Sequence, residues 1–376
     1  MPDIEIKKVE SKKMRKDFVN LPWEAKLYEN DPIWVPQLVS EQMHFIDPDK
    51  GYFFEHGDAD FFIAYINGKP VGRISAHINH LHENIHDKET GFFGFFEAID
   101  DIDVARKLLN TAESWLKAKG KSKMLGPQSL SIYDPIGFVV DGIEISPVVG
   151  LFHNAPYYID LVEKCGLQKS VDWYCFLVDG TDPSLKPYLT DVKEHIMKSQ
   201  DIEYIEITKK EIRKRSDIIK NIFNTAWQGN WGHIPFSDKQ FKMLFKELKN
   251  FAIPDLAIFA EKLGESVGFI LSIPDVNPAL RLLNGHLYPW RIVKFLREMN
   301  KTKRIRTILM GVLPEYRGRG IDAVLVLKTI ENALKLGFVD SDCSLIVETN
   351  AKMINALRPL KAKRYKTYRL YERPIR

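Results

Sequence analysis

The sequence has few cysteines, little net charge and no long apolar run. Cys165, Cys175 and Cys343 lie far apart, without the spacing of metal ligands or of a disulfide framework, which suits a reducing compartment. The net charge is only +4 and no basic arm is present, so the composition gives no support for nucleic-acid binding. No apolar run approaches the roughly 20 residues of a membrane helix, and the start of the chain does not resemble a signal peptide. We therefore expect a cytoplasmic protein without a transmembrane segment.

Length and internal repetition indicate two related domains. The 376 residues, 45% of them hydrophobic, are enough to bury two cores. Val71-Gly72 recurs as Val267-Gly268, and Asn154 recurs as Asn350, both 196 positions later. The predicted order of strands and helices repeats in the same way. The sequence therefore predicts a tandem duplication, with domains at 1–180 and 181–376.

The most informative stretch is 307–337, TILMGVLPEYRGRGIDAVLVLKTIENALKLG. Its first seven residues predict a buried strand, and from Ile321 the apolar positions recur at helical spacing until Gly337. Between them lies a turn with two arginines and two glycines, Arg317-Gly318-Arg319-Gly320. We call residues 317–320 the basic glycine loop. Because free amides and the positive end of the helix dipole point toward such a loop, the sequence predicts a bound phosphate.

Two classes of phosphate ligand fit this pattern. Residues 318–323 match the dinucleotide fingerprint, with Glu348 at the end of the next strand. Only 28 residues follow Glu348, however, which is too short for the further strand–helix units of a dinucleotide fold. Coenzyme A is the other class. The stretch resembles the acyl-CoA loop of the GNAT acetyltransferase superfamily, Gln/Arg-x-x-Gly-x-Gly/Ala, with Arg317 and Gly320 matching and Asp322 departing.

The resemblance implies a set of cofactor-binding residues. Asp322 is a normal residue for a first helical turn, but its carboxylate would repel a pyrophosphate beside it. We expect acetyl-CoA or a longer acyl-CoA to be the co-substrate, bound by Val312, Leu313, Arg317, Gly318, Arg319, Gly320, Ile321, Asp322 and Asn350.

The two halves differ at this loop. The helix-ending glycines Gly120 and Gly337 are 217 positions apart, because half one inserts residues 127–152 and half two inserts residues 279–303. With that offset, the basic glycine loop falls opposite Asp100 and Asp103. A carboxylate would then lie where a pyrophosphate rests, so we expect the first domain to have a degenerate cofactor loop.

Acyl transfer to an amine needs a base for the amine's proton, and three residues are candidates. Asp275, Glu348 and His233 each have a structural alternative as well: turn residue, exposed strand end and partner of Trp231, respectively. Asp275 leads, because it ends a strand expected to face the cofactor. The expected substrate-binding residues are Asn230, Trp231 and Asn277. The superfamily's usual general acid is a tyrosine seven residues after an asparagine like Asn350, where this chain has Leu357, unless Tyr365 or Tyr368 substitutes.

Four histidines between two predicted strands raise the question of a metal. His77, His80, His82 and His86 have spacings that fit no helical ligand pair, and the segment has the composition of a polar loop. We therefore predict no metal site.

The whole chain resembles a group of tandem acyltransferase-like proteins that includes the bacterial ceramide synthase-like family. The segments that carry the resemblance are GFFGFFE, HNAPYY, NWG, PDVN, GVLPEYRGRGID and YKTYRLYE. It implies an α/β (α+β) fold built from two GNAT-like domains, each a mixed, mainly antiparallel sheet flanked by helices.

The activity implied by the resemblance is acyl-CoA-dependent N-acylation of an amine. We expect the acceptor to be a small-molecule or lipid amine and the chain to be a monomer or homodimer, and peripheral membrane contact is an open alternative. The alternative is a non-catalytic acyl-CoA-binding or sensor protein, which Asp322 and Leu357 favour.

Overall fold

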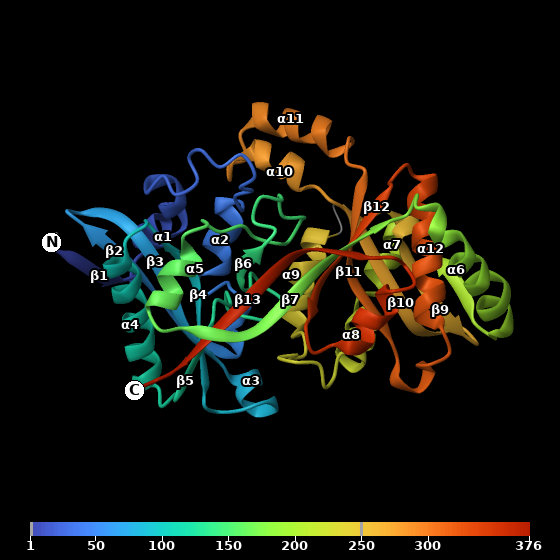
Figure 1. The fold of residues 1–376 in the computed structure, drawn as a ribbon, viewed down its shortest axis with the longest axis horizontal. Coiled ribbons are helices and arrows are strands. Elements are labelled where there is room, and N and C mark those ends of the chain that lie inside the picture. Colours follow the sequence, from blue (N-terminus) through green and yellow to red (C-terminus); the bar gives the residue numbers. More distant parts are fainter. Residues whose placement is uncertain (1–2, 249–250) are drawn as a thin grey trace. The chain divides into compact units, whose positions relative to one another are not determined.

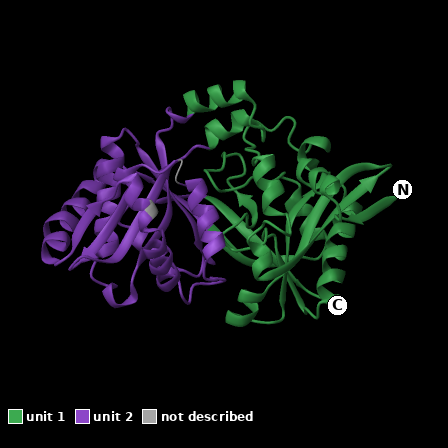
Figure 2. Ribbon diagram, turned by 180° about the vertical axis from the view of Figure 1, so that it is seen from behind, with its two compact units in different colours: residues 1–173, 277–298, 366–376 green, residues 174–276, 299–365 purple. Residues whose placement is uncertain are grey.

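Two compact units divide the chain in this computed structural model, which describes residues 3–248 and 251–376 (Figure 2). Unit 1 comprises Met1–Trp173, Asn277–Glu298 and Lys366–Arg376, and unit 2 comprises Tyr174–Val276 and Met299–Tyr365. Unit 1 therefore takes in two segments from the second half of the sequence. The predicted domain boundary between residues 180 and 181 separates the two duplicated halves of the sequence, and it stays a prediction.

Unit 1 is a mainly antiparallel sheet with strand order β1-β2-β3-β4-β5-β13, where β13 is Lys363–Pro374 (Figure 1). Helix α4 packs on it through buried Val104, Leu108 and Leu116. Its elements are β1 (Ile4–Lys8), α1 (Lys12–Glu24), α2 (Val39–Phe45), η1 (Phe53–Glu55), β2 (Gly57–Ile66), β3 (Lys69–Asn79), α3 (His80–Ile85), β4 (Thr90–Ala98), α4 (Ile102–Ala118), β5 (Lys123–Gly126), β6 (Phe138–Asp141), α5 (Tyr158–Lys164) and α10 (Asn277–Leu283), with most of α11 (Pro289–Met299).

Unit 2 has the corresponding order β7-β12-β11-β10-β9-β8, where β7 is Gln168–Asp179. Its elements are the 3-10 helices η2 (Pro183–Leu185), η4 (Met197–Ser199), η5 (Pro254–Leu256) and η6 (Pro314–Tyr316), the π-helix η3 (Val192–Ile196), the α-helices α6 (Lys186–Asp191), α7 (Lys209–Lys214), α8 (Ser216–Ala226), α9 (Asp238–Leu248), α12 (Ile321–Lys335) and α13 (Ala351–Leu357), and the strands β8 (Glu203–Glu206), β9 (Ala257–Lys262), β10 (Glu265–Pro274), β11 (Arg304–Val312) and β12 (Asp340–Val347).

The same arrangement recurs in both units, which confirms the predicted duplication. A hairpin is closed by Asn67-Gly68 in unit 1 and by Leu263-Gly264 in unit 2, and all four of these residues have positive φ, as a type I′ turn requires. A parallel pair follows in each unit, β4 with β5 and β11 with β12. In both units the helix that crosses over between the parallel strands ends beside a glycine with positive φ, Gly120 or Gly337.

Two long strands, β7 (Gln168–Asp179) and β13 (Lys363–Pro374), each have residues in both units. In unit 1, β13 pairs with β5, Tyr371 lying opposite Gly126. In unit 2, β7 lies next to β12. Each unit therefore completes its sheet with a strand from the other half of the sequence, an exchange that we did not predict.

The core of unit 2 fixes the position of α12. Ile321 and Leu325 are buried against Ile258 and Ile270 of the sheet. On the opposite sheet face, α8 lies so close to Gly311 that an added Cβ would be 3.2 Å from the side chain of Ala226. Truncating Leu325 to alanine would cost about 2–5 kcal/mol, because the cavity left behind cannot close fully.

Several predicted element boundaries need correction. Pro22 lies inside α1, which runs on to Glu24, although a proline often ends a helix. Residues 154–166 have a sequence that favours a helix, but only Tyr158–Lys164 form one, α5. The histidine-rich segment is not a loop but contains α3, capped by the side chain of Asn79. The insertion at 279–303, for which we predicted no element, carries α10 and α11.

Candidate functional site

The basic glycine loop connects β11 to α12, as predicted. Gly318 and Gly320 have φ of +75° and +78°, and Gly320 is the N-cap of α12. Among residues 3–248 and 251–376, no side chain caps this helix. Within the described residues, the amides of residues 318–323 have no hydrogen-bond acceptor, and the first intrahelical bond runs from Val324 to the Gly320 carbonyl. Six consecutive donors at a helix N-terminus are suited to bind an anion.

Hydrogen bonds of Arg317 and contacts from neighbouring side chains fix the position of the basic glycine loop. Arg317 Nε donates to the Val312 carbonyl at 3.3 Å, and Arg317 Nη2 donates to the Ala226 carbonyl at the C-terminus of α8. Gln200 donates to the Arg319 carbonyl, and Ile196 packs against Gly320. Arg317 therefore shapes the loop as well as adding positive charge. The segment with Ile196 and Gln200 gave no signal in the sequence.

The strands leading to the loop separate from each other. β11 and β12 pair at only three positions, ending with Arg306 opposite Asp342, although both strands run on for several residues. We call this separation the fork. Along residues 307–312, no segment of the described chain hydrogen-bonds in the fork; the bonds of this stretch go to β10 and to the side chains of Trp227, Arg317 and Ser272. The edge of β11 therefore presents peptide groups to a ligand lying in the fork.

The counterpart in unit 1 is closed in two ways. The side chain of Asp101 caps α4, accepting from the amides of Asp103 at 2.8 Å and Val104 at 3.2 Å. Between β4 and β5, the Gln128 amide donates to the Phe93 carbonyl at 2.8 Å, so the segment 127–136 lies where the unit 2 fork has no such segment. Both the helix amides and the strand edge of unit 1 are thus already bonded within the chain.

A buried carboxyl group, that of Asp342, lies at the closed end of the fork. Asp342 Oδ2 accepts from the Tyr365 hydroxyl and from Ser344 Oγ, both at 2.7 Å, and Oδ1 lies 3.6 Å from Arg306 Nε. Burial raises the pKa of Asp342, although Arg306 and these hydrogen bonds lower it. We had considered Tyr365 but missed Asp342. The signal was the pair of alternating charges on each strand, Arg304 and Arg306 opposite Asp340 and Asp342.

The three predicted bases lie at different places in unit 2. Asp275 is buried beside Arg304, and its amide donates to the Arg304 carbonyl at 2.9 Å, at the start of β11. The basic glycine loop follows the opposite end of β11. Eight residues of strand separate Arg304 from that end, which corresponds to about 26 Å. Glu348 follows the end of β12, 3.4 Å from the Tyr174 hydroxyl, and His233 is buried near Phe223 of α8. Only Asp275 lies near Arg304 and the closed end of the fork.

Several other predicted residues have structural partners. Asn350 caps α13 by accepting from the Met353 amide, and Leu357 is buried in the core. Asn277 belongs to unit 1, where its side chain donates to the Pro147 carbonyl at 2.7 Å. Asn230 and Trp231 lie in the half-buried turn after α8. The binding roles of Asn230, Trp231, Asn277 and Asn350 stay predictions.

Asp322, the departure from the superfamily pattern, lies on the exposed first turn of α12. Burial raises the pKa of Tyr188 and Tyr204, and the Asp322 carboxylate raises both further. This carboxylate therefore lies on the side of α12 that faces α6 and β8. Ile321 is buried, so only its backbone is available to a ligand at the loop.

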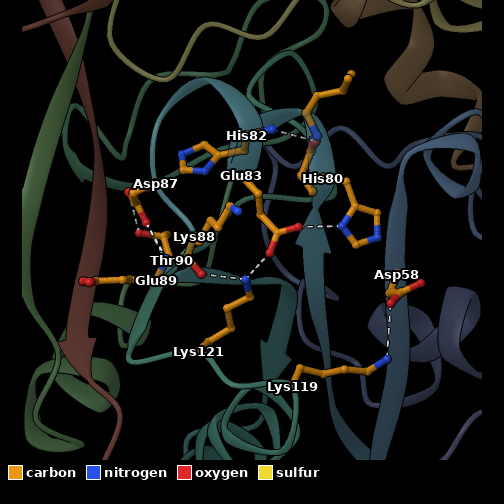
Figure 3. Close-up of polar contacts among 12 residues, drawn as sticks. Asp58, His80, His82, Glu83, Asp87, Lys88, Glu89, Thr90, Lys119 and Lys121 are labelled. Carbon is orange, nitrogen blue, oxygen red and sulfur yellow. Dashed lines mark hydrogen bonds and ion pairs between the residues drawn. The ribbon is translucent and has the colours of Figure 1, made fainter.

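The histidine cluster is organised by ion pairs. Glu83 accepts from Lys121 and lies 2.6 Å from His80 Nδ1, and Lys121 also donates to the Lys88 carbonyl (Figure 3). Burial lowers the pKa of His77 to about 3 and that of His82 to about 4. In the part of the chain that the structure describes, no three His, Cys, Asp or Glu side chains gather as metal ligands.

Known proteins resemble this chain over nearly its whole length. No family model matches the chain. It is 35% identical over 368 residues to Protein YghO of Escherichia coli, covering 96% of this chain and 93% of that protein. It is 30% identical over 380 residues to the bacterial ceramide synthase of Caulobacter vibrioides, covering 99% and 98%. The chain belongs to the bacterial ceramide synthase-like family.

Solved structures place this ceramide synthase-like chain in the tandem GNAT fold. A tandem GNAT protein from the clavulanic acid biosynthesis pathway superposes with a TM-score of 0.54 at 11% identity, covering 100% of this chain and 99% of that one. A GCN5-related N-acetyltransferase from Sphaerobacter thermophilus gives 0.51 at 12% identity, covering 100% and 97%. At such identities the likeness shows the fold, which confirms the predicted fold class.

The structure also has a cavity away from the candidate site. One cavity of about 200 Å³ lies between α8 and α9, lined by Lys220, Phe241 and Phe245, and is separate from the loop and the fork. Among the residues described, no helix is long and apolar enough to cross a membrane.

Proposed function

We propose that the chain is an acyl-CoA-dependent N-acyltransferase of the GNAT type, with its co-substrate site in unit 2. The observation that carries this is the contrast between the two units. Within the described residues, the amides at the start of α12 have no acceptor, whereas Asp101 accepts from those of α4. In the part of the chain that the structure describes, no segment is bonded in the fork of unit 2 as residues 127–136 are in unit 1. One duplicated site is therefore kept for a ligand, and the other is degenerate.

The ligand that fits is coenzyme A with an acyl group. Its pyrophosphate is suited to the amides and arginines of the basic glycine loop. Its pantetheine arm carries amide groups, which can hydrogen-bond to the edge of β11 along the fork. The thioester would then lie toward the closed end of the fork, where Asp342, Tyr365 and Asp275 are found.

Proton transfer assigns roles to these groups. Attack of an amine nitrogen on the thioester carbon forms the amide bond and breaks the carbon–sulfur bond, so the amine loses a proton and the thiolate gains one. Asp275 is the leading base, with Glu348 and His233 as the other candidates. Tyr365, hydrogen-bonded to Asp342, is the donor to the thiolate in place of the superfamily tyrosine. Leu357 is buried and has no proton to give.

The acceptor that we propose is a long-chain or lipid amine. This rests on the Caulobacter relative, whose name is bacterial ceramide synthase and whose length is almost fully covered. The alternative is a non-catalytic acyl-CoA-binding protein, favoured by the buried leucine at the superfamily's acid position.

Thiol release separates the two functions. Acetyl-CoA or palmitoyl-CoA is mixed with the protein and a set of amines that includes long-chain amines, and free thiol is followed with a colorimetric reagent. Release that requires an amine indicates a transferase. A rise in melting temperature with acyl-CoA, without thiol release, indicates a binding protein. If acyl-CoA causes neither, both functions are refuted.

A further inference from the structure

The segment inserted in half two forms an exposed amphipathic helix. Figures 1 and 2 both show α11 at the periphery of unit 1, beyond α10. Ile292, Phe295 and Met299 are half-buried, whereas Trp290, Val293 and Leu296 are 63%, 50% and 51% exposed. The apolar face of α11 is therefore wider than the side that packs on the protein.

This exposed face is part of a larger patch. Of the twelve exposed large apolar residues in the described chain, six lie within residues 282–296, and we call them the apolar patch: Leu282, Leu287, Tyr288, Trp290, Val293 and Leu296. The rings of Tyr288 and Trp290 stack with centroids 5.0 Å apart. A cluster of this kind on a protein surface marks a contact site rather than chance exposure.

Positive charge borders the patch. Arg291, Lys294 and Arg297 lie on α11, with Glu298 as its one acidic residue. Arg291 donates to the Leu283 carbonyl and lies over the Tyr288 ring, so its contacts help to fix the position of Tyr288 in the apolar patch. Lys294 and Arg297 are exposed beside Val293 and Leu296. Apolar and aromatic side chains next to exposed lysine and arginine form the pattern of a helix that lies in a membrane interface.

We propose that the apolar patch docks unit 1 on an anionic lipid bilayer, with α11 lying in the plane of the interface. Leu296, Val293 and the Tyr288–Trp290 pair would enter the headgroup region, while Lys294 and Arg297 bind lipid phosphates. A second copy of the chain fits less well, because a two-fold contact through this patch would bring equal positive charges together. The inference does not depend on the proposed enzymatic function.

Vesicle flotation tests the proposal. The full chain is mixed with vesicles of phosphatidylglycerol and phosphatidylcholine, or of phosphatidylcholine alone. We expect it to float with the anionic vesicles and to be released by high salt. The double variant Trp290→Ser/Leu296→Ser should bind the anionic vesicles at least about tenfold more weakly than the wild type, because it loses the inserted apolar area. Lys294→Glu/Arg297→Glu should lose binding to anionic vesicles specifically.

The matched control is Leu263→Ser, which removes a 91% exposed leucine in the β9–β10 turn and should leave flotation unchanged. Failure of the full chain to float with anionic vesicles would overturn the proposal, as would equal flotation of the Trp290→Ser/Leu296→Ser variant. Sedimentation provides the competing outcome. If that variant instead converts a dimer to a monomer without changing flotation, the patch is a contact between copies and the bilayer proposal is wrong.

Discussion

Replacing Gly320 by alanine tests whether the shape of the basic glycine loop sets coenzyme A affinity. Gly320 has φ of +78°, where an alanine costs about 1 kcal/mol. An added Cβ would also lie 2.6 Å from Cγ2 of Ile196, and relieving that contact costs about a further 1–2 kcal/mol. The free loop can relax by moving, so ligand binding must restore the strained shape. We expect affinity to fall by about 2–3 kcal/mol, or roughly 30- to 150-fold.

Calorimetric titration of coenzyme A measures this change, and two further variants separate its causes. Ile196→Ala combined with Gly320→Ala removes the contact and leaves only the backbone strain, so the loss should shrink to about fivefold. Gly264→Ala is the control, because Gly264 has φ of +82° and open space around it, in a hairpin turn away from the loop. It should lower the melting temperature without changing affinity.

The reasoning is refuted if Gly320→Ala binds coenzyme A within about twofold of the wild type while Gly264→Ala is destabilised as expected. That result would show that the loop amides do not position the ligand. A loss of affinity that Ile196→Ala does not reduce would leave the loop as the site but assign the effect to backbone strain alone.

Three further predictions concern charge and proton transfer. Asp322→Gly should tighten coenzyme A by up to about 1 kcal/mol if the carboxylate acts on the phosphates, measured by calorimetry; weaker binding would show a favourable contact. Asp275→Asn and Tyr365→Phe should each lower thiol release by about 100-fold with unchanged affinity, and a wild-type rate in either removes that residue from the mechanism. Burial lowers the pKa of His77 from 6.5 to about 3 in the folded chain, so the unfolded chain binds the proton at a higher pH. The contribution of neutral His77 to the free energy of unfolding is therefore complete above pH 6.5 and is lost as the pH falls toward 3. At pH 5 the loss is about 2 kcal/mol, and His77→Phe should reduce the difference between urea midpoints at pH 7.5 and pH 5.

The loop and its helix could be predicted because their signals are local. Glycines that need positive φ, the apolar spacing of α12 and the stop at Gly337 all lie within one stretch of sequence. The hairpin at Asn67-Gly68 was predictable for the same reason. The tandem fold followed from repetition of such local signals at a fixed offset.

Long-range pairing could not be predicted in this way. The Asp342–Tyr365 contact depends on the register of β12 against β11 and on the position of β13; the alternating charges of β11 and β12 indicate that register only once the two strands are known to pair, and no local pattern places β13. The exchange of β7 and β13 between units has the same origin. Helix α11 is a different case, because Pro289 at its first position and the spacing of Trp290, Val293 and Leu296 were readable signals. We missed them because the segment has no counterpart in half one.

Calorimetric titration of coenzyme A into the wild-type chain and the Arg317→Glu variant tests the central claim most directly. Arg317 joins the Val312 and Ala226 carbonyls to the loop, so a carboxylate there would repel both these groups and the ligand's phosphates. Asp103→Gly, in the first turn of α4 in unit 1, is the control. We predict binding by the wild type and by Asp103→Gly, and none by Arg317→Glu. The same affinity in wild type and Arg317→Glu, or loss of binding in Asp103→Gly alone, would contradict a coenzyme A site in unit 2.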